Sequence, residues 1–537
     1  METTALIGPK KINYIATKQL WGTKKLPDLE RLKTLISYVE TPHELTTIRA
    51  PFTGEIIGTV PICTTEDVQI ALQRARNAQR SWAQTRISER KAIFLRFHDL
   101  ILQHQEELLN LLQVESGKNR LTGQDEVFDV VINSRYYAMR AEKYLRPQRR
   151  KGAIPLLTQT MEFHQPLGVI GNVAPWNYPL AMAISDAIPA ILAGNCVVLK
   201  TAEETPFIAL YAAQILYEAG LPPDVLQVVT GKGRVVGPIF IKEADFLTFT
   251  GSTATGRRLA GEAGESLLKC SMELGGKNPA IVLDDADLNK AVPGILRGSF
   301  ANAGQLCVHM ERVYVQGGIY DRYVAELVRQ VKEMKLSTAM DFSADMGSLI
   351  SQDQLDKVTQ HVEDALRKGA VLLTGGKARP DIGPFFFEPT LLKNITPEMT
   401  LYAEETFGPV VSIYRFEDVE QAIQLANASS YGLNSSIWTR DVRRGREIAG
   451  RLQTGTANIN EALNATWGSV DSPMGGMKAS GLGRRHGKEG MLKYTETQTV
   501  SSQSLMLIGP NRFMPPKRYA KIMAVLLKLM KAIPGLG

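Results

Sequence analysis

The sequence predicts an α/β protein whose main sheet is parallel and covered by helices. From residue 168 to 275, short β-rich runs alternate with helix-length segments, which is the pattern of a parallel dinucleotide-binding sheet. A second alternating block runs from 276 to 478. With 537 residues, of which 44% are hydrophobic and 22% charged, the chain is globular and too long for one core. Two or three domains are therefore expected.

The individual elements follow from hydrophobic periodicity. Residues from about 70 to 146 have apolar positions three and four apart, which predicts helices. Strands are predicted at 169–173, 196–200, 226–230, 246–250, 280–283, 312–315 and 410–416. Helices are predicted at 181–192, 206–219, 235–243, 254–263 and 320–334. Two further β-prone pieces, 154–167 and 494–505, flank these blocks and predict a small extra sheet made from both sides.

These elements suggest boundaries for the parts of the chain. The predicted cofactor-binding domain comprises 1–146 and 168–275, and the predicted catalytic domain 276–478. A small β arm is assigned to 147–167 and 491–505, and a basic tail to 512–537.

Charge and cysteine content narrow the class of protein. The net charge is +7, but no acidic residue follows Glu496, and six positive charges lie beyond it. The body therefore lacks the basic stripe that a nucleic-acid groove requires, and no nucleic-acid partner is expected. Four scattered cysteines argue against a disulfide framework. Because no signal-peptide core or membrane-length apolar stretch is present, we expect a cytoplasmic protein.

The tail has its own pattern. From Lys517 to Ile533 the periodicity is helical, with lysines on one face and large apolar side chains on the other. Such a helix can lie on an anionic membrane as a peripheral contact. It can equally pack on the enzyme's own surface or on another subunit, as terminal helices usually do. Lys528 and Lys531 exclude a true membrane span.

Three residues suggest acyl chemistry. Cys307 follows a small Asn-Ala-Gly loop that lets backbone amides approach its sulfur; a lone cysteine is otherwise usually an inert buried residue. Glu273 ends a β-prone run before two glycines and could activate a water, although it could also be a surface turn residue. Asn177 follows the first parallel strand and could stabilise an oxyanion, or simply form a turn between prolines.

Other residues fit a nucleotide site. Lys200 ends the second strand, where open α/β sheets bind ligands, and Glu203 could accept from the same ribose. Gly231 and Gly251 each open a strand-to-helix turn that suits a phosphate. Neither turn is a G-x-G-x-x-G fingerprint, and each signal is weak alone.

Taken together and in order, these segments resemble those of the aldehyde dehydrogenase superfamily from about residue 45 to 500. The resemblance is carried by Pro175-Trp-Asn-Tyr-Pro179, Phe249-Thr-Gly-Ser252, Glu273-Leu-Gly-Gly-Lys277, Gly304-Gln-Leu-Cys307 and Glu405-Thr-Phe-Gly-Pro409. It implies an aldehyde dehydrogenase-like fold with an oligomerisation arm, hence a homodimer or homotetramer.

The resemblance also assigns roles. Cys307 would be the nucleophile that forms a thiohemiacetal and then a thioester, Glu273 the base that hydrolyses it, and Asn177 the oxyanion donor. The cofactor residues would be Trp176, Lys200, Glu203, Ser252, Glu405 and Phe407. No metal site is expected. NAD is the expected cofactor because Glu203 would repel a 2′-phosphate, with NADP as the alternative.

The substrate is less defined. Met346-Gly-Ser-Leu-Ile-Ser351 and Gly483-Arg-Arg-His-Gly487 resemble a bacterial branch named succinate-semialdehyde dehydrogenase, with Ser469 as a tentative substrate contact. Yet Ser185 and Ala301 stand where better-known members carry two arginines for the substrate carboxylate. Arg485 stands where several relatives have a second acidic residue, so it is not assigned as a base.

Several alternatives stay open at this stage. One is a dehydrogenase of uncharged medium-chain or aromatic aldehydes, and another is a cysteine thioesterase or esterase. A CoA-acylating relative would not need Glu273, and a non-enzymatic relative would have no reason to keep Cys307, Glu273 and Asn177 together.

Overall fold

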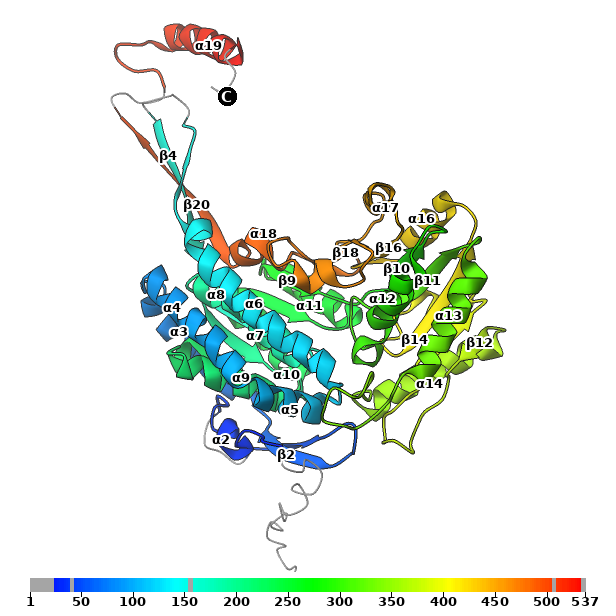
Figure 1. The fold of residues 1–537 in the computed structure, drawn as a ribbon. Helices are drawn as coiled ribbons and strands as arrows, with labels where there is room; N and C mark the ends of the chain where they lie inside the picture. The colour runs from blue at the N-terminus through cyan, green and yellow to red at the C-terminus, as the bar shows by residue number, and fades with distance from the viewer. Residues whose placement is uncertain (1–23, 39–42, 153–157, 505–508, 533–537) are drawn as a thin grey trace, which may run out of the picture.

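The protein consists of two α/β lobes and a projecting β arm that carries a terminal helix (Figure 1). This computed structural model describes residues 24–38, 43–152, 158–504 and 509–532. Parts of the predicted arm and tail, including Ile533 on the apolar face of the tail, lie outside the described residues.

The first lobe is built on a six-stranded sheet with the order β19-β9-β8-β5-β6-β7. Its strands are β5 (Val169–Val173), β6 (Cys196–Lys200), β7 (Leu226–Val229), β8 (Phe246–Thr250), β9 (Cys270–Glu273) and β19 (Gly481–Leu482). All pairs are parallel except that of β19 with β9. The chain adds β6 and β7 on one side of β5, and β8 and β9 on the other. The strand order therefore reverses at β5, and the ligand crevice of such sheets lies beyond the carboxyl ends at this point.

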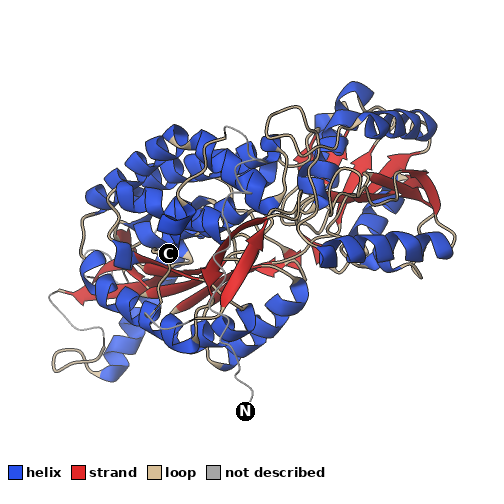
Figure 2. Cartoon of the chain, turned by 90° about the horizontal axis from the view of Figure 1, so that it is seen from below, coloured by secondary structure: helices blue, strands red, loops and turns tan. Residues whose placement is uncertain are grey.

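Helices cover both faces of this sheet (Figure 2). They are α2 (Leu29–Lys33), α3 (Thr65–Trp82), α4 (Ile87–Gln103), α5 (Gln105–Ser116), α6 (Arg120–Leu145), α7 (Pro179–Ile184), α8 (Ala187–Leu192), α9 (Pro206–Glu218), α10 (Gly233–Glu243), α11 (Thr253–Glu265) and α18 (Gly487–Leu492). A hairpin of β1 (Leu45–Arg49) and β2 (Ile56–Pro61) adjoins them. The predicted helix 181–192 is in fact two helices, α7 and α8. Pro189 has no N–H to donate to the carbonyl of Ser185, which weakens the helix where α7 ends.

The second lobe holds a seven-stranded sheet with the order β12-β13-β14-β11-β10-β16-β17. Its strands are β10 (Asn278–Val282), β11 (Met310–Gln316), β12 (Val371–Thr374), β13 (Thr390–Lys393), β14 (Val410–Phe416), β16 (Ser436–Trp438) and β17 (Asn458–Ile459). Its helices are α12 (Leu288–Phe300), α13 (Tyr320–Glu333), α14 (Gln352–Arg367), α15 (Thr400–Ala403), α16 (Val419–Asn427) and α17 (Val442–Ala449). A short pair, β15 (Tyr431–Gly432) and β18 (Met477–Lys478), lies outside this sheet. The chain passes between the sheets from Glu273 to Asn278 and returns to the first sheet with β19.

The arm is a three-stranded antiparallel sheet that extends away from both lobes (Figure 1). In it β4 (Thr158–Pro166) pairs with β20 (Thr495–Gln503) along its whole length, and with β3 (Gln148–Arg150). The two β-prone pieces predicted on either side of the sequence thus pair with each other. Beyond β20, α19 (Pro516–Ala532) lies at the far end of the arm. No helix among the described residues is long and apolar enough to cross a membrane.

Candidate active site

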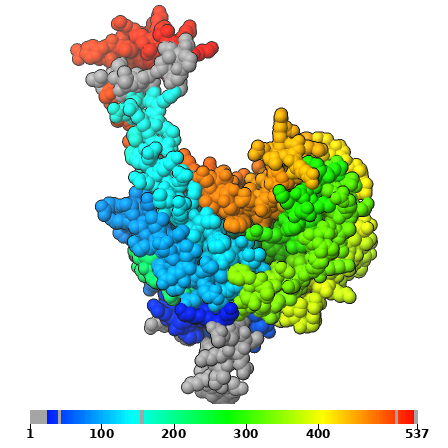
Figure 3. Space-filling view, in the orientation of Figure 1, coloured from blue at the N-terminus to red at the C-terminus, as the bar shows by residue number. Residues whose placement is uncertain are grey.

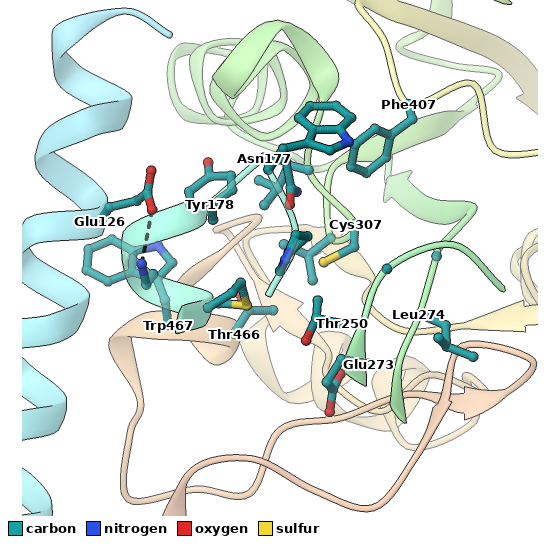
Figure 4. A pocket seen from close by; sticks show the side chains of 18 of the residues that line it. Glu126, Asn177, Tyr178, Thr250, Glu273, Leu274, Cys307, Phe407, Thr466 and Trp467 are labelled. Carbon is teal, nitrogen blue, oxygen red and sulfur yellow. Dashed lines mark hydrogen bonds between the residues drawn. The ribbon is translucent and has the colours of Figure 1, made fainter. Parts of the chain in front are cut away.

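A cavity of about 310 Å³ lies at the carboxyl edge of the first sheet, where that edge faces the second lobe. The loops after β5 and β8 and the end of β9 contribute to its wall, as the reversal of strand order at β5 predicts. Of the predicted site residues, the cavity brings together Trp176, Asn177, Gly251, Ser252, Glu273, Cys307, Glu405 and Phe407. Figure 4 shows the sulfur of Cys307 facing the space into which Asn177 and Glu273 also point.

The loop before Cys307 is held in a strained conformation. Asn302 and Ala303 both have a φ of 53°, in the left-handed region that side chains other than glycine rarely adopt. The Asn302 side chain donates to the carbonyls of Asn177 (3.0 Å) and Gln305 (3.1 Å). Gln305 in turn accepts from the amide of Ile350 at 2.9 Å. These bonds fix the backbone from which the sulfur projects, so the loop is rigid here and not flexible as its composition suggested.

Asn177 is anchored to the same loop. Its side-chain Nδ2 donates to the Gln305 carbonyl at 3.0 Å, which uses one of the two N–H groups of the amide. Its own carbonyl accepts from Nζ of Lys118 at 2.8 Å. Lys118 also pairs with Glu126 and lies 4.4 Å from the ring centroid of Tyr178. A buried ion pair between Lys118, in the loop before α6, and Glu126 of α6 therefore sets the position of the Asn177 segment.

Glu273 is fixed through its backbone while its carboxyl group stays unpaired. Its carbonyl accepts from the amide of Gly251 at 3.1 Å, and β19 pairs with it through Gly481. The side chain is buried, and neither carboxyl oxygen has a hydrogen-bond partner. A β-carbon at Gly475 would lie 3.1 Å from Oε1, so a glycine leaves room there for the carboxyl group. A buried carboxyl without partners is costly for folding, which indicates a functional role.

The electrostatics of the cavity affect the ionisation of both Glu273 and Cys307. Burial raises the pKa of Glu273 to about 7, while the charges of Arg485 and Lys493 lower it. Burial, Glu405 and Glu273 together raise the pKa of the Cys307 thiol to about 12. At neutral pH the thiol is therefore protonated, whereas Glu273 is near its midpoint. Glu273 is thus the group in this pair that can accept a proton near neutral pH.

A second set of residues shapes the opposite wall. Glu405 accepts from the amide of Gly276 at 2.8 Å, and burial raises its pKa to about 7. Glu311 accepts from the amides of Thr406 (2.9 Å) and Phe407 (3.1 Å). Phe407, with a φ of 55°, packs edge-on against Trp176 with ring centroids 5.5 Å apart. Since Glu311 also pairs with Lys277, one buried carboxylate connects this wall to the chain that follows Glu273.

Comparison with known proteins decides the family. The profile of the aldehyde dehydrogenase family matches residues 38–500. The chain belongs to the aldehyde dehydrogenase family. A Mycolicibacterium smegmatis protein, provisionally named an NADP(+)-dependent succinate-semialdehyde dehydrogenase, is 47% identical over 95% of this chain and 98% of its own length. The mitochondrial succinate-semialdehyde dehydrogenase of Arabidopsis thaliana is 38% identical over 84% of this chain and 85% of its own.

A solved structure supports the fold. The NAD+ complex of an aldehyde dehydrogenase from Bacillus cereus has a TM-score of 0.84 and 33% identity, covering 90% of this chain and 99% of that one. The predicted fold and the predicted activity, an NAD(P)-dependent aldehyde dehydrogenase, are thereby confirmed.

The remaining predicted cofactor residues lie outside the cavity wall, along the same sheet edge. Lys200 is buried at the end of β6, and its Nζ would lie 3.9 Å from a β-carbon at Gly233, at the start of α10. Glu203 is exposed nearby and draws the pKa of Lys200 upward against the effect of burial. Gly231 has a φ of 107°, which makes glycine the favoured residue in that turn. Open space at Gly233 beside a lysine fits a dinucleotide that passes the α10 N-terminus.

Ser469, the tentative substrate contact, is not part of the cavity wall. The same loop instead contributes Thr466 and Trp467, which point into the cavity (Figure 4). Ser185, one of the positions without an arginine, donates to Asp129 at 2.5 Å. The inward direction of Thr466 and Trp467 could not be foreseen from the loop sequence, because it depends on the irregular turn between Asn464 and Gly468.

The cavity also contains charged residues that sequence reasoning missed. Arg485, to which the sequence analysis assigned no role, lines the wall and is buried. Its Nε lies 3.1 Å from Asp186. Asp125, Glu126 and Asp129 of α6 line it too. Their spacing along the helix could have suggested a shared face, since i, i+1 and i+4 positions partly overlap. Nothing in the sequence connects α6 to Cys307, however, so this part of the wall needed the structure.

Proposed function

We propose that Cys307 attacks the substrate aldehyde, with Glu273 as base and Asn177 as oxyanion donor. The supporting observation is that one cavity brings a thiol together with a buried carboxyl group that has no hydrogen-bond partner. As a carboxylate, Glu273 takes the proton of the thiol while sulfur bonds to the carbonyl carbon. The oxygen of the thiohemiacetal then lies near the second N–H of the Asn177 amide, which Gln305 leaves free.

A bound nicotinamide supplies the acceptor for the hydride that leaves the thiohemiacetal. The residues of this chain do the rest. Cys307 retains the acyl group as a thioester, and Glu273, after losing its proton to solvent, removes a proton from a water that attacks it. The carboxylic acid departs and the sulfur is regenerated. Purified protein should form reduced nicotinamide from an aldehyde without added CoA, and a strict requirement for CoA would contradict hydrolysis by Glu273.

For the substrate we propose an aldehyde with a carboxylate at its other end, with succinate semialdehyde as first choice. The proposal follows the names of the M. smegmatis and A. thaliana relatives. Arg485 supplies a charge-assisted partner for that carboxylate, in place of the arginines that Ser185 and Ala301 replace. Lowering the charge by Arg485→Gln should reduce kcat/KM for succinate semialdehyde about tenfold more than for hexanal, the loss typical of one charge-assisted hydrogen bond. An equal loss for both substrates would remove Arg485 as the carboxylate partner.

A second candidate substrate is an uncharged medium-chain or aromatic aldehyde. It is favoured by the wall itself, where Tyr178, Met182 and Trp467 are apolar or aromatic and Asp125 and Asp129 are acidic. Burial raises the pKa of Asp129 to about 6, so this carboxylate is mostly charged at neutral pH and would repel an anionic tail. A ratio of about ten between two substrates is the size expected from one apolar contact. If kcat/KM for hexanal or benzaldehyde exceeds that for succinate semialdehyde by this factor, the uncharged class is the physiological one.

We also propose a homodimer or homotetramer in the cytoplasm. The arm leaves β20 as an edge strand with mostly exposed residues, and such edges pair with another chain. A catalytic thiol and three further unpaired cysteines suit a reducing compartment. Light scattering coupled to gel filtration gives the mass in solution, and a monomer at micromolar concentration would contradict the proposed assembly.

A further inference from the structure

The C-terminal helix α19 exposes its apolar side chains instead of burying them. On the apolar face, Ile522, Leu526 and Leu529 have exposed fractions of 37%, 42% and 54%, and Phe513 just before the helix is 86% exposed. None of the described apolar residues of α19 belongs to the three hydrophobic cores. In Figures 1 and 3 the helix lies at the tip of the arm, well away from both lobes. The sequence left open that the helix packs on the enzyme's own surface, and the described structure does not show such packing.

The helix divides into two opposite faces. At 100° per residue, Lys517, Lys521, Lys528 and Lys531 fall within one stripe of about 80°. The opposite stripe holds the large apolar side chains, namely Tyr519, Ile522, Met523, Leu526, Leu529 and Met530. Small alanines, Ala520 and Ala524, lie on the lysine side and leave the ammonium groups free to extend sideways.

Charge decides which partner fits this surface. Six of the seven net positive charges of the chain lie beyond Glu496, with no acidic residue among them. A second copy of the chain offers no net negative charge to attract the tail, because its remaining residues are nearly neutral overall. An anionic lipid surface offers both negative headgroups for the lysines and an acyl region for the apolar side chains. With 17 residues, α19 is about 25 Å long, which suits a helix that lies in the plane of the interface.

We propose that α19 binds the enzyme to anionic membranes as a peripheral interfacial helix. Its apolar face inserts at the level of the acyl chains, and its lysines remain among the headgroups. Because the arm holds α19 away from the cavity with Cys307, binding leaves the active site accessible. The lysines at 528 and 531 keep the helix at the surface, and no described helix qualifies as a span.

The test uses full-length enzyme and sedimentation with vesicles of phosphatidylcholine alone or with phosphatidylserine. We expect sedimentation with the anionic vesicles at low salt, and loss of it as salt rises, since headgroup attraction is screened. Leu526→Gln/Leu529→Gln should lower the partition coefficient about tenfold or more, as two buried apolar side chains are lost. The matched control, Ala520→Gln/Ala524→Gln, adds the same two amides on the lysine face and should change it less than about twofold. All variants should retain full dehydrogenase activity, because α19 touches no residue of the cavity.

Two results would overturn the proposal. One is that wild-type enzyme stays in the supernatant with anionic vesicles at low salt. The other is that Leu526→Gln/Leu529→Gln reduces the mass of the enzyme in vesicle-free solution, measured by light scattering, while the control does not. The second result would show that the apolar face of α19 is buried between subunits. Dehydrogenase activity is measured independently, so failure here leaves the proposed chemistry of Cys307 untouched.

Discussion

Replacing Glu273 by glutamine separates the two halves of the proposed reaction. Glutamine keeps the shape of the side chain but cannot accept a proton from water, so hydrolysis of the thioester should slow about 100-fold or more. The first half, which also loses its proton acceptor, should slow much less, because solvent can take the thiol proton instead. The charge of Glu273 raises the pKa of the Cys307 thiol, and its removal makes the thiol easier to ionise directly to solvent. Each active site should therefore form one equivalent of reduced nicotinamide quickly and then turn over slowly.

The pH dependence of the wild-type enzyme follows from the same carboxyl group. With a pKa of about 7, Glu273 is roughly one-tenth ionised at pH 6, half at pH 7 and nine-tenths at pH 8. Steady-state turnover limited by hydrolysis should therefore rise about ninefold from pH 6 to pH 8, with a midpoint near 7. The slow residual turnover of Glu273→Gln should lack this limb.

Stopped-flow absorbance of reduced nicotinamide measures the burst and the steady state in one trace. Glu273→Asp is a useful control, because it retains a base but shortens the reach of the carboxyl group. The assignment fails if Glu273→Gln loses burst and steady-state rate by the same factor, or if its residual turnover keeps the midpoint near pH 7.

Further predictions concern stability, the cofactor wall and cofactor choice. Because the folded-state pKa of Glu273 is raised from 4.5 to about 7, the wild type should lose about 3 kcal/mol of stability as pH rises through this interval. The Tm difference between Glu273→Gln and wild type should therefore shift in favour of the variant from pH 5 to pH 8; a constant difference would contradict the raised pKa. Glu311→Gln weakens the acceptor for the amides of Thr406 and Phe407. We expect KM for the cofactor to rise about tenfold and KM for the aldehyde to change less. Equal changes in both KM values would indicate general unfolding. Glu203→Ala should shift the ratio of kcat/KM values toward NADP about tenfold, an effect of one removed like charge beside a phosphate; no shift would mean that Lys200 and its neighbours alone set cofactor choice.

The elements that periodicity predicts are those whose side chains repeat on a buried face. The strands around β5 and the pairing of two distant β-prone pieces in the arm could be predicted because each segment carries its own apolar pattern. The division of 181–192 into two helices depended on a single proline, Pro189, and the apolar periodicity of this segment does not reveal the break. No strand was predicted at β19, because periodicity cannot reveal a strand of two residues.

The site divides in the same way. Cys307, Glu273 and Asn177 could be proposed from the sequence because each lies in a motif at the end of a strand or in a turn, and the structure places all three on one cavity. Lys118 and Glu126 could not, since one is a charged residue in a loop and the other a charged residue on α6. They become significant only where this segment packs behind Asn177. Arg485 illustrates the limit most clearly. In the sequence it is one of two adjacent arginines, and only the structure shows that it is buried beside Asp186 and lines the cavity.

Charges of both signs around Glu273 set how readily its carboxyl group ionises. Burial alone would push the pKa of Glu273 upward and leave it protonated, unable to accept a proton from water. Arg485 and Lys493 lower that pKa, and Asp186, which pairs with Arg485, limits how far they do so. The same arginine also lowers the pKa of Cys307, so one cation favours both the base and the nucleophile. Because the charge of Glu273 raises the pKa of Cys307, the thiolate is disfavoured while Glu273 is charged, and the two groups titrate as a coupled pair.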